Sequence, residues 1–381
     1  MSEPPRILIV TAAFGEGHNS AARNMALAFD RIGVVSQVHD PCLLGVPRLT
    51  RMVNSGYRYV TTNFPKIWER IYHSMDRFDF NRKQSPFLRR VEFTLEKLID
   101  DFQPTAIVST FPLYPYFVHR IARRTGRHLP LFVIVTDSME INATWLRADS
   151  DYWLVTDSVT KEKMQATGLP AAKIFDTGFA VTPEFSSLTT LTSTDACDPF
   201  RILYFPTAKL PFVRRHARAL LDSSPNVKLT IVLGRNVRLL YSRTREIKLE
   251  YPGRVKLVGW TRKVPQLLTR HHLVVGKAGG ATVHEAIAAQ CPMLIHHLVP
   301  GQEEGNLKLL EIIGGGNLAD TPESLKSHVQ GMLAHNQAGW REMKLALKAH
   351  DKNAGAIVAA DFILSHLDQS DPVRLASAPP L

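Results

Sequence analysis

The stretch GKAGGATVHEAIAAQCPMLIHHLVPGQEEGN, residues 276–306, decides the fold of the second half of the chain. It follows an apolar run at Leu273–Val275 that is typical of a buried strand, and it opens with a glycine-rich turn. From Thr282 onward apolar residues recur at helical spacing, so the pattern predicts a strand, a tight turn and a helix. Such a turn leaves the first helical amides unpaired. These amides and the positive end of the helix dipole suit a diphosphate.

Several residues around this turn have the spacing expected of a nucleotide site. Glu285 falls about one turn into the helix, where its carboxylate could accept both hydroxyls of a ribose. A second strand at Pro292–His296 leads to a polar loop, residues 300–306, that offers hydroxyl-binding groups. An ordinary strand-to-helix turn with a favourable first-turn acid is the alternative. The candidates for nucleotide-sugar binding here are Gly279, Gly280, Ala281, Thr282, Glu285, Gln302, Glu303 and Asn306.

The whole chain alternates strands and helices, which predicts two Rossmann-like, doubly wound parallel α/β domains. At 381 residues it is too long for one ordinary core. The expected domains are residues 1–185 and 200–368, joined by a linker rich in Ser and Thr at 186–199. The last helix, about 338–367, is expected to return toward the first domain, and residues 369–381 are expected to be a disordered tail.

Composition restricts the class of protein and its partners. The net charge of +11 indicates an anionic partner. No stretch approaches the roughly 20 apolar residues that cross a bilayer, and the first strand, Arg6–Val10, is too short for a signal peptide. Cys42, Cys197 and Cys291 are odd in number and scattered, which indicates no disulfide framework or zinc site and fits a reducing cytoplasm.

The positive charge is concentrated between Arg48 and Arg90, a segment that contains ten basic and only three acidic residues, with aromatic residues interleaved. This mixture suits an anionic membrane surface. Nucleic acid would attract the same charges, but no nucleic-acid fold motif occurs. A pair of amphipathic helices with solvated basic faces is the structural alternative. The membrane candidates from this segment are Trp68, Arg70, Arg77, Arg82 and Lys83.

A second candidate site lies in the first domain, where TAAFGEGH, residues 11–18, follows the opening strand. A helix is expected from Asn19 or Ser20, so His18 lies at a helix N-terminus, where the dipole disfavours imidazolium. A neutral imidazole can accept a proton, although His18 could also only cap the helix. Asp137 ends a strand and is expected at the ligand-binding edge of the sheet, with an ordinary N-cap role as its alternative.

The chain resembles the monogalactosyldiacylglycerol synthase and processive diacylglycerol glucosyltransferase group of glycosyltransferase family 28 over nearly all of residues 6–365. The resemblance rests on the motifs already quoted, together with LGRN at 233–236 and VGW at 258–260. It implies the GT-B fold, in which two domains face each other across a cleft. It also implies an inverting transfer of a hexose from UDP-hexose to diacylglycerol or a similar lipid, by a peripheral enzyme on the cytoplasmic face of the membrane.

The resemblance also implies residue roles. His18 would be the general base, with Gly15 and Gly17 in the acceptor loop, and Asp137 would orient His18 or bind the acceptor. Trp260 and Thr261 would hold uracil through backbone groups, although Trp260 could be a core aromatic. Two further residues, Arg235 and Asn236, could reach the diphosphate or cap a helix. No cofactor and no metal is expected, because the helix terminus would stabilise the leaving UDP.

The segment after Asp137 departs from the group, because a histidine that commonly follows is replaced by Ser138 and one residue is inserted before Trp145, and this leaves the acceptor open. A second departure lies in the other domain, where Pro206–Lys209 stands in place of a glycine-rich run and Lys209 could supply charge to the phosphates. The alternatives are a transferase that uses UDP-N-acetylglucosamine, an enzyme like UDP-N-acetylglucosamine 2-epimerase, and a non-enzymatic UDP-sugar or anionic-lipid binding module. The basic aromatic segment argues against the epimerase, and His18 argues against the binding module.

Overall fold

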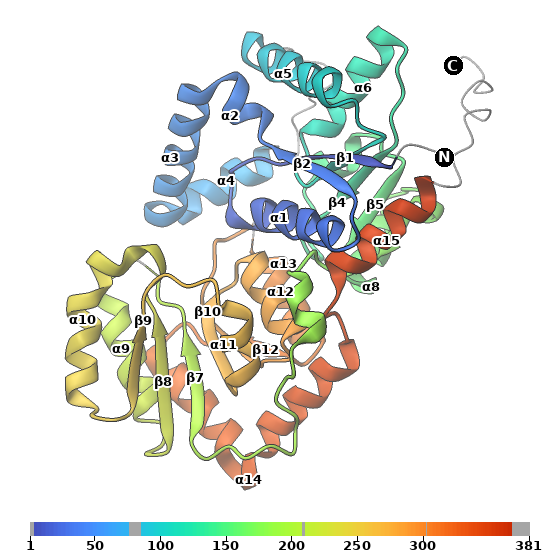
Figure 1. The fold of residues 1–381 in the computed structure, drawn as a ribbon. Coiled ribbons are helices and arrows are strands. Elements are labelled where there is room, and N and C mark those ends of the chain that lie inside the picture. Colours follow the sequence, from blue (N-terminus) through green and yellow to red (C-terminus); the bar gives the residue numbers. More distant parts are fainter. Residues whose placement is uncertain (1–3, 76–84, 208–209, 302, 368–381) are drawn as a thin grey trace. The chain divides into compact units, whose positions relative to one another are not determined.

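A computed structural model describes residues 4–75, 85–207, 210–301 and 303–367. The chain divides into two compact units (Figure 1). Unit 1 is made of residues 1–183 and 354–381, and unit 2 of residues 184–353. Each unit contains one six-stranded sheet whose strands all run parallel. The predicted fold class, two Rossmann-like α/β domains, is therefore confirmed.

The sheet of unit 1 has the order β2-β1-β3-β4-β5-β6. The strand order reverses between β1 and β3, and doubly wound sheets bind ligands at the carboxyl ends of the strands on either side of such a switch point. Near-continuous apolar runs form the inner strands because both faces of the sheet are covered there, whereas the edge strand β2 has no buried residue. The strands are β1 (Arg6–Val10), β2 (Val35–His39), β3 (Ala106–Ser109), β4 (Leu131–Ile134), β5 (Tyr152–Val155) and β6 (Ile174–Asp176).

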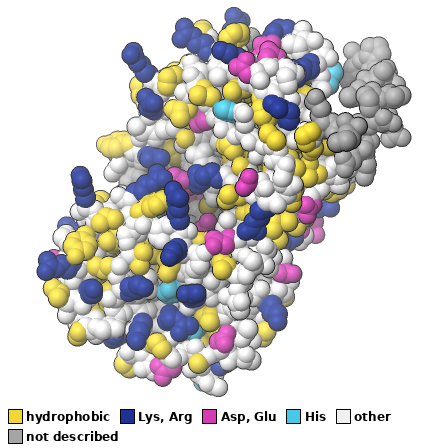
Figure 2. Space-filling model, in the orientation of Figure 1, with side chains coloured by type: hydrophobic (Ala, Val, Ile, Leu, Met, Phe, Trp, Pro, Cys, Tyr) yellow, Lys and Arg dark blue, Asp and Glu magenta, His cyan; other side chains and the backbone are white. Residues whose placement is uncertain are grey.

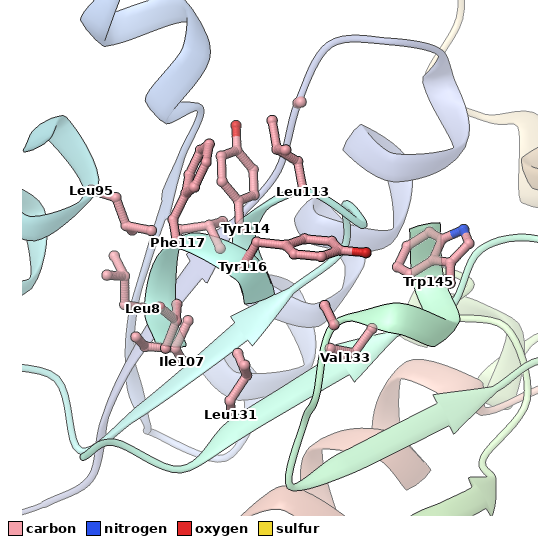
Figure 3. Close-up of a cluster of buried hydrophobic side chains, with 14 of the residues drawn as sticks. Leu8, Leu95, Ile107, Leu113, Tyr114, Tyr116, Phe117, Leu131, Val133 and Trp145 are labelled. Carbon is pink, nitrogen blue, oxygen red and sulfur yellow. The ribbon is translucent and has the colours of Figure 1, made fainter. Parts of the chain in front are cut away.

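Helices cover both faces of this sheet and enclose its core. Figure 3 shows part of that core, in which Tyr116 of α6 extends over Val133 toward Trp145, and Phe117 lies beside Tyr114. The helices are α1 (Glu16–Arg31), α2 (Pro41–Gly45), α3 (Pro47–Asn63), α4 (Pro65–Met75), α5 (Pro86–Phe102), α6 (Tyr114–Thr125), α7 (Ala143–Arg147), α8 (Ser158–Ala166) and α15 (Gly355–Leu367). The short turns η1 (Ala171–Lys173) and η2 (Pro183–Ser187) complete the series.

The sheet of unit 2 has the order β12-β11-β10-β7-β8-β9, with its switch point between β10 and β7. Its strands are β7 (Phe200–Tyr204), β8 (Val227–Val232), β9 (Val255–Val258), β10 (Leu273–Lys277), β11 (Met293–His297) and β12 (Gly316–Leu318). Its helices are α9 (Leu210–Leu221), η3 (Gly234–Asn236), α10 (Val237–Glu250), α11 (Val264–Arg270), α12 (Gly280–Ala288), α13 (Glu304–Ile312) and α14 (Pro322–His350).

The expected linker, residues 186–199, is part of unit 2 rather than a free connection. The Leu191 amide donates to the Thr269 carbonyl at 3.3 Å, and His272 Nε2 lies 3.0 Å from the Ala196 carbonyl. The side chain of Cys197 is buried in the core of this unit. A composition rich in Ser and Thr predicted a linker between the domains, but these backbone groups find partners on the neighbouring strand ends and helices of unit 2.

The expected last helix, 338–367, is two helices that belong to different units. Helix α14 leaves helical geometry at residues 334–337, and Asp351 ends it with a left-handed conformation at φ 43°. Helix α15 then packs on unit 1, where Phe362 and Phe175 have ring centroids 4.4 Å apart. The expected boundary at 368 therefore differs from the structure, because the apolar face of α15 is buried against β5 and β6 rather than in unit 2.

No helix in the part of the chain that the structure describes is long and apolar enough to cross a membrane. All three cysteines are buried and free.

Candidate active site

His18 lies at the switch point of unit 1, in the first turn of α1. The loop from β1 reaches α1 through Gly15, whose φ of 119° is a conformation that side chains disfavour. A Cβ atom at Gly15 or at Gly17 would meet nothing within 4 Å. The backbone around His18 is therefore open to an approaching ligand. Glycine is required at position 15 by its backbone conformation and not by crowding from neighbouring atoms.

Two groups on neighbouring strand ends hold the imidazole of His18. Its Nδ1 lies 2.7 Å from the Thr110 carbonyl, just after β3, and 2.9 Å from Thr136 Oγ1, just after β4. A carbonyl oxygen can only accept, so Nδ1 carries the proton and donates it. In the neutral ring Nε2 then has a free lone pair. This tautomer leaves Nε2 as the atom that can accept a proton from a substrate.

Burial keeps this imidazole neutral. The ring packs edge-on to Phe111, with centroids 5.1 Å apart, and lies 5.9 Å from the ring of Trp145. Desolvation lowers the pKa of His18 to about 4, although the bond to the Thr110 carbonyl favours the charged form. The sequence attributed neutrality to the helix dipole, whereas burial is the largest cause.

Asp137 follows Thr136 and is bound by a tryptophan rather than by His18. The indole Nε1 of Trp145 donates to Asp137 Oδ2 at 2.8 Å. Burial raises the pKa of Asp137 to about 6, and the indole bond opposes this shift. The N-cap alternative is wrong, because the nearest helix, α7, is capped by Asn142. Asp137 and His18 therefore share one edge of the sheet and one aromatic neighbour, Trp145.

The glycine turn in unit 2 joins β10 to α12 as predicted, and the helix begins at Gly280 with Gly279 as its N-cap. No side chain makes a capping bond there. A Cβ atom at Gly279 would lie 3.8 Å from Glu303 Oε1 and 4.0 Å from Lys277 Cε, which is ordinary contact. The first amides of α12 are therefore not capped by a side chain and have the dipole and geometry that bind an anion.

Two residues of the polar loop, Glu303 and Asn306, are buried and bind this turn and the neighbouring chain. Both Glu303 oxygens are engaged, because Oε1 pairs with Lys277 Nζ at 2.7 Å and Oε2 accepts from the Val299 amide at 2.8 Å. Asn306 Nδ2 donates to the Ala278 carbonyl at 3.0 Å. The Asn306 Oδ1 atom is buried and has no protein partner. These contacts fix the loop against the turn, so Glu303 has a structural task that the sequence did not indicate.

The other nucleotide candidates lie at the same carboxyl edge of the unit 2 sheet. Arg235 and Asn236 follow β8 and are exposed, and Asn236 precedes α10 without making a capping bond. Trp260 follows β9 and is 55 % exposed, so the core-aromatic alternative is wrong. The Arg262 guanidinium lies 5.5 Å from the Trp260 ring centroid.

Four further candidates lie after β9 and within α12. Thr261 accepts from the Lys263 amide at 3.0 Å, and Glu285 lies half-buried within α12, as do Ala281 and Thr282 in its first turn. Gln302 lies outside the described residues, as do Arg77, Arg82 and Lys83 of the membrane segment.

The described part of the membrane segment forms two amphipathic helices, α3 and α4, and the first turns of α5, which hold Arg89 and Arg90. Arg70 is exposed, whereas Trp68 is half-buried and packs edge-on to Tyr57 with ring centroids 4.8 Å apart. Trp68 therefore joins the two helices rather than projecting from them. The exposed apolar side chains of this surface are Leu49, Met52, Val53, Tyr59, Phe64, Ile67 and Ile71.

Sequence reasoning missed three residues of these sites. Thr110 and Thr136 hold His18, and Lys277 pairs with Glu303. Thr110 directly follows β3, Thr136 lies two residues after β4, and Lys277 ends β10, so a search for polar residues at predicted strand ends would have found them.

Each unit has the doubly wound parallel sheet of a GT-B domain, with polar groups at its switch point. A family model described as monogalactosyldiacylglycerol (MGDG) synthase matches residues 18–181. The chain is 24 % identical over 373 residues to a processive diacylglycerol beta-glucosyltransferase of Bacillus subtilis, and the match covers 95 % of this chain and 96 % of the relative. A Bacillus licheniformis protein of the same description is also 24 % identical. The chain is thus related to this glycosyltransferase group, as the motifs indicated.

Solved structures show the same two-unit architecture. The MurG structure from Acinetobacter baumannii superposes with a TM-score of 0.62 at 16 % identity, covering 95 % of this chain and all of that one. The UDP-GlcNAc 2-epimerase from Neisseria meningitidis, bound to UDP-GlcNAc, superposes with a TM-score of 0.59 at 12 % identity and covers 96 % of this chain. At this identity the likeness concerns the fold alone.

Proposed function

We propose that this protein is an inverting glycosyltransferase that moves a hexose from UDP-glucose or UDP-galactose to diacylglycerol or a similar membrane lipid. The observation that carries the proposal is the bare Nε2 of His18, held at the ligand-binding edge of unit 1 with Nδ1 bound to Thr110. A binding module has no need of a base with this tautomer. The relatives whose printed names are processive diacylglycerol beta-glucosyltransferase support the choice of lipid and reaction.

The chemistry follows from these positions. His18 Nε2 takes the proton from the acceptor hydroxyl as the oxygen attacks the anomeric carbon of the hexose. The bond between that carbon and the UDP oxygen breaks, and UDP leaves with the electron pair. Attack from the opposite side turns an α-linked donor into a β-glycoside. The neutral state of His18 at pH 7 makes it a base before the acceptor arrives.

The donor is assigned to unit 2. The diphosphate lies on the amides of Gly279–Thr282, with the ribose on Glu285 and the uracil beside Trp260 and Thr261. Charge that develops on the leaving UDP is stabilised by the α12 terminus, whose first amides are not capped by a side chain. We expect no metal requirement, since this terminus supplies the positive end of a helix dipole, and transfer should persist in excess EDTA.

The acceptor reaches unit 1 from a membrane. Apolar side chains on α3 and α4 are exposed, with Met52 at 64 % and Tyr59 at 62 %. Arg51, Arg58 and Lys66 are interspersed with them and are exposed as well. Figure 2 shows basic and apolar side chains mixed on one face of the molecule. We assign α3 and α4 to a peripheral contact with the anionic cytoplasmic face, where each cation near the surface contributes about 1 kcal/mol.

The test is transfer by the purified protein from UDP-glucose, UDP-galactose and UDP-N-acetylglucosamine, each with anionic vesicles that contain diacylglycerol. Release of UDP with one donor, together with a new glycolipid, dependence on vesicles and loss in His18→Ala, is the expected result. If UDP binds but no donor is consumed with vesicles, the lipid assignment fails. Conversion of UDP-N-acetylglucosamine without any lipid would assign the epimerase reaction instead.

A further inference from the structure

Asp40 lies directly after β2 and binds the loop that leads to His18. Its Oδ2 accepts from the Ala13 amide at 3.1 Å, and its Oδ1 accepts from the Leu43 amide at 2.8 Å. The second bond caps α2, which any N-cap carboxylate would do with one oxygen. The first bond serves a different element, because Ala13 belongs to the loop between β1 and α1.

A second side chain holds the same loop. Tyr114 is fully buried at the start of α6, and its hydroxyl donates to the Thr11 carbonyl at 2.9 Å. The Cys42 amide in turn points at this hydroxyl from 3.4 Å. Residues 11 and 13 of the loop are thus held by groups from β2 and α6. Two residues beyond Ala13, Gly15 gives the loop its most permissive backbone position, and His18 follows in the first turn of α1.

The same contacts extend to the membrane helices. The Cys42 carbonyl accepts from Thr50 Oγ1 at 2.7 Å, and Thr50 is a buried residue of α3. Hydrogen bonds therefore connect α3 to α2, α2 to Asp40, and Asp40 to the loop of His18. Helix α3 is also the helix whose exposed face carries Met52 and Tyr59. A shift of α3 at a membrane would therefore be transmitted through these hydrogen bonds to the loop that positions His18.

We propose that Asp40 is a positioning residue that couples the seating of α3 on a membrane to the placement of His18. The proposal rests on the function proposed above. In this proposal Asp40 has two roles: it caps α2, and it allows a lipid surface to stimulate the turnover of the enzyme. In the docked state the loop is held and His18 Nε2 meets the acceptor hydroxyl. When the Asp40 contact is lost, the loop is free and docking no longer affects turnover.

The chain offers a selective variant. In Asp40→Asn the amide oxygen can still cap α2, since asparagine is as good an N-cap as aspartate. Its NH2 group then faces the Ala13 amide, so two donors oppose each other and the loop contact is lost. Tyr114→Phe is the second variant, which keeps the buried ring but removes the donor to Thr11, together with the longer contacts of the same hydroxyl to the Cys42 amide at 3.4 Å and to Asp40 Oδ1 at 3.5 Å. The matched control is Asp151→Asn, since Asp151 Oδ2 accepts from the Leu131 amide at 2.8 Å at the opposite edge of the same sheet.

The measurement is turnover on vesicles that contain diacylglycerol and on a short-chain diacylglycerol in solution, with vesicle binding and the donor KM followed in parallel. A base displaced by about 1 Å can lose a factor of about 100 in rate. We expect Asp40→Asn and Tyr114→Phe to lose 10- to 100-fold in kcat on vesicles, with vesicle binding and donor KM within about two-fold of the wild type. The ratio of vesicle to soluble turnover should fall toward one. The control should keep the wild-type ratio.

Three outcomes would overturn the coupling. One is an unchanged ratio in Asp40→Asn, another is an equal loss in Asp151→Asn, and the third is a wild type whose turnover is the same on both acceptors. If Asp40→Asn fails to fold, as judged by circular dichroism, the result for Tyr114→Phe decides. A wild type that transfers no sugar to either acceptor would refute the proposed function itself, which separates that failure from the failure of the coupling.

Discussion

The pH dependence of sugar transfer should reveal the buried state of His18. Burial lowers its pKa to about 4, whereas an exposed imidazole titrates near 6.5. At pH 5.5 the site as described leaves only about 3 % of His18 protonated, whereas an exposed histidine would be about 90 % protonated. The rate should therefore fall to half near pH 4 rather than near pH 6.5, because only the neutral imidazole can accept the proton from the acceptor.

Asp137 must be separated from this effect, since burial raises its own pKa to about 6. Asp137→Asn removes that titration, and the amide oxygen can still accept from the Trp145 indole. The assay is UDP release at saturating donor between pH 4 and pH 8 in Asp137→Asn. Anionic vesicles that contain diacylglycerol, and whose phosphodiester headgroups stay ionised between pH 4 and pH 8, keep the surface charge nearly constant across that range.

A half-maximal rate near pH 6.5 in Asp137→Asn would refute the reasoning, because it would mean that His18 is solvated. A limb near pH 6 that is present in the wild type and absent from Asp137→Asn would show that ionised Asp137 takes part in the reaction. Unfolding at low pH is excluded by circular dichroism at each assay pH, and irreversible loss is excluded by returning each sample to pH 7 and measuring its rate again.

Three further predictions concern binding and stability. Gly279→Ala should keep the melting temperature, since the new Cβ has room, but should weaken UDP binding by about ten-fold in calorimetry, because the methyl group stands where the diphosphate approaches the backbone. Gly355→Ala should destabilise unit 1 by about 1–3 kcal/mol in urea unfolding, because its Cβ would lie 2.0 Å from the Phe179 carbonyl oxygen; an unchanged midpoint would contradict this packing. The free energy of unfolding should fall as pH drops from 6.5 toward 4, because the unfolded chain binds protons at four histidines that burial keeps neutral in the fold. Each contributes up to about 1.4 kcal/mol per pH unit, and stability that does not change with pH in that range would show that they are solvated. These residues are His18, His216, His271 and His272.

The sequence predicted the fold because its signals are local. Apolar runs of strand length, such as Leu273–Val275, are separated by helical periodicity, and glycine marks the turn from β10 to α12. The domain boundaries could not be predicted where a segment has neither strand nor helix periodicity. Residues 186–199 are polar and suggested a free linker, yet their backbone groups are bound by unit 2.

The two parallel sheets, the glycine turn and the candidacy of His18 could all be predicted from the sequence, because each depends on residues close together along the chain. The tautomer of His18 could not, since Thr110 and Thr136 follow strands that lie about 90 and 120 residues further along and meet at one edge of the sheet. The folded structure also shows that both oxygens of Glu303 are occupied and that Asp40 holds the loop before His18. Hydrogen bonds depend on positions within a fraction of an ångström, and that precision arises only when distant segments pack.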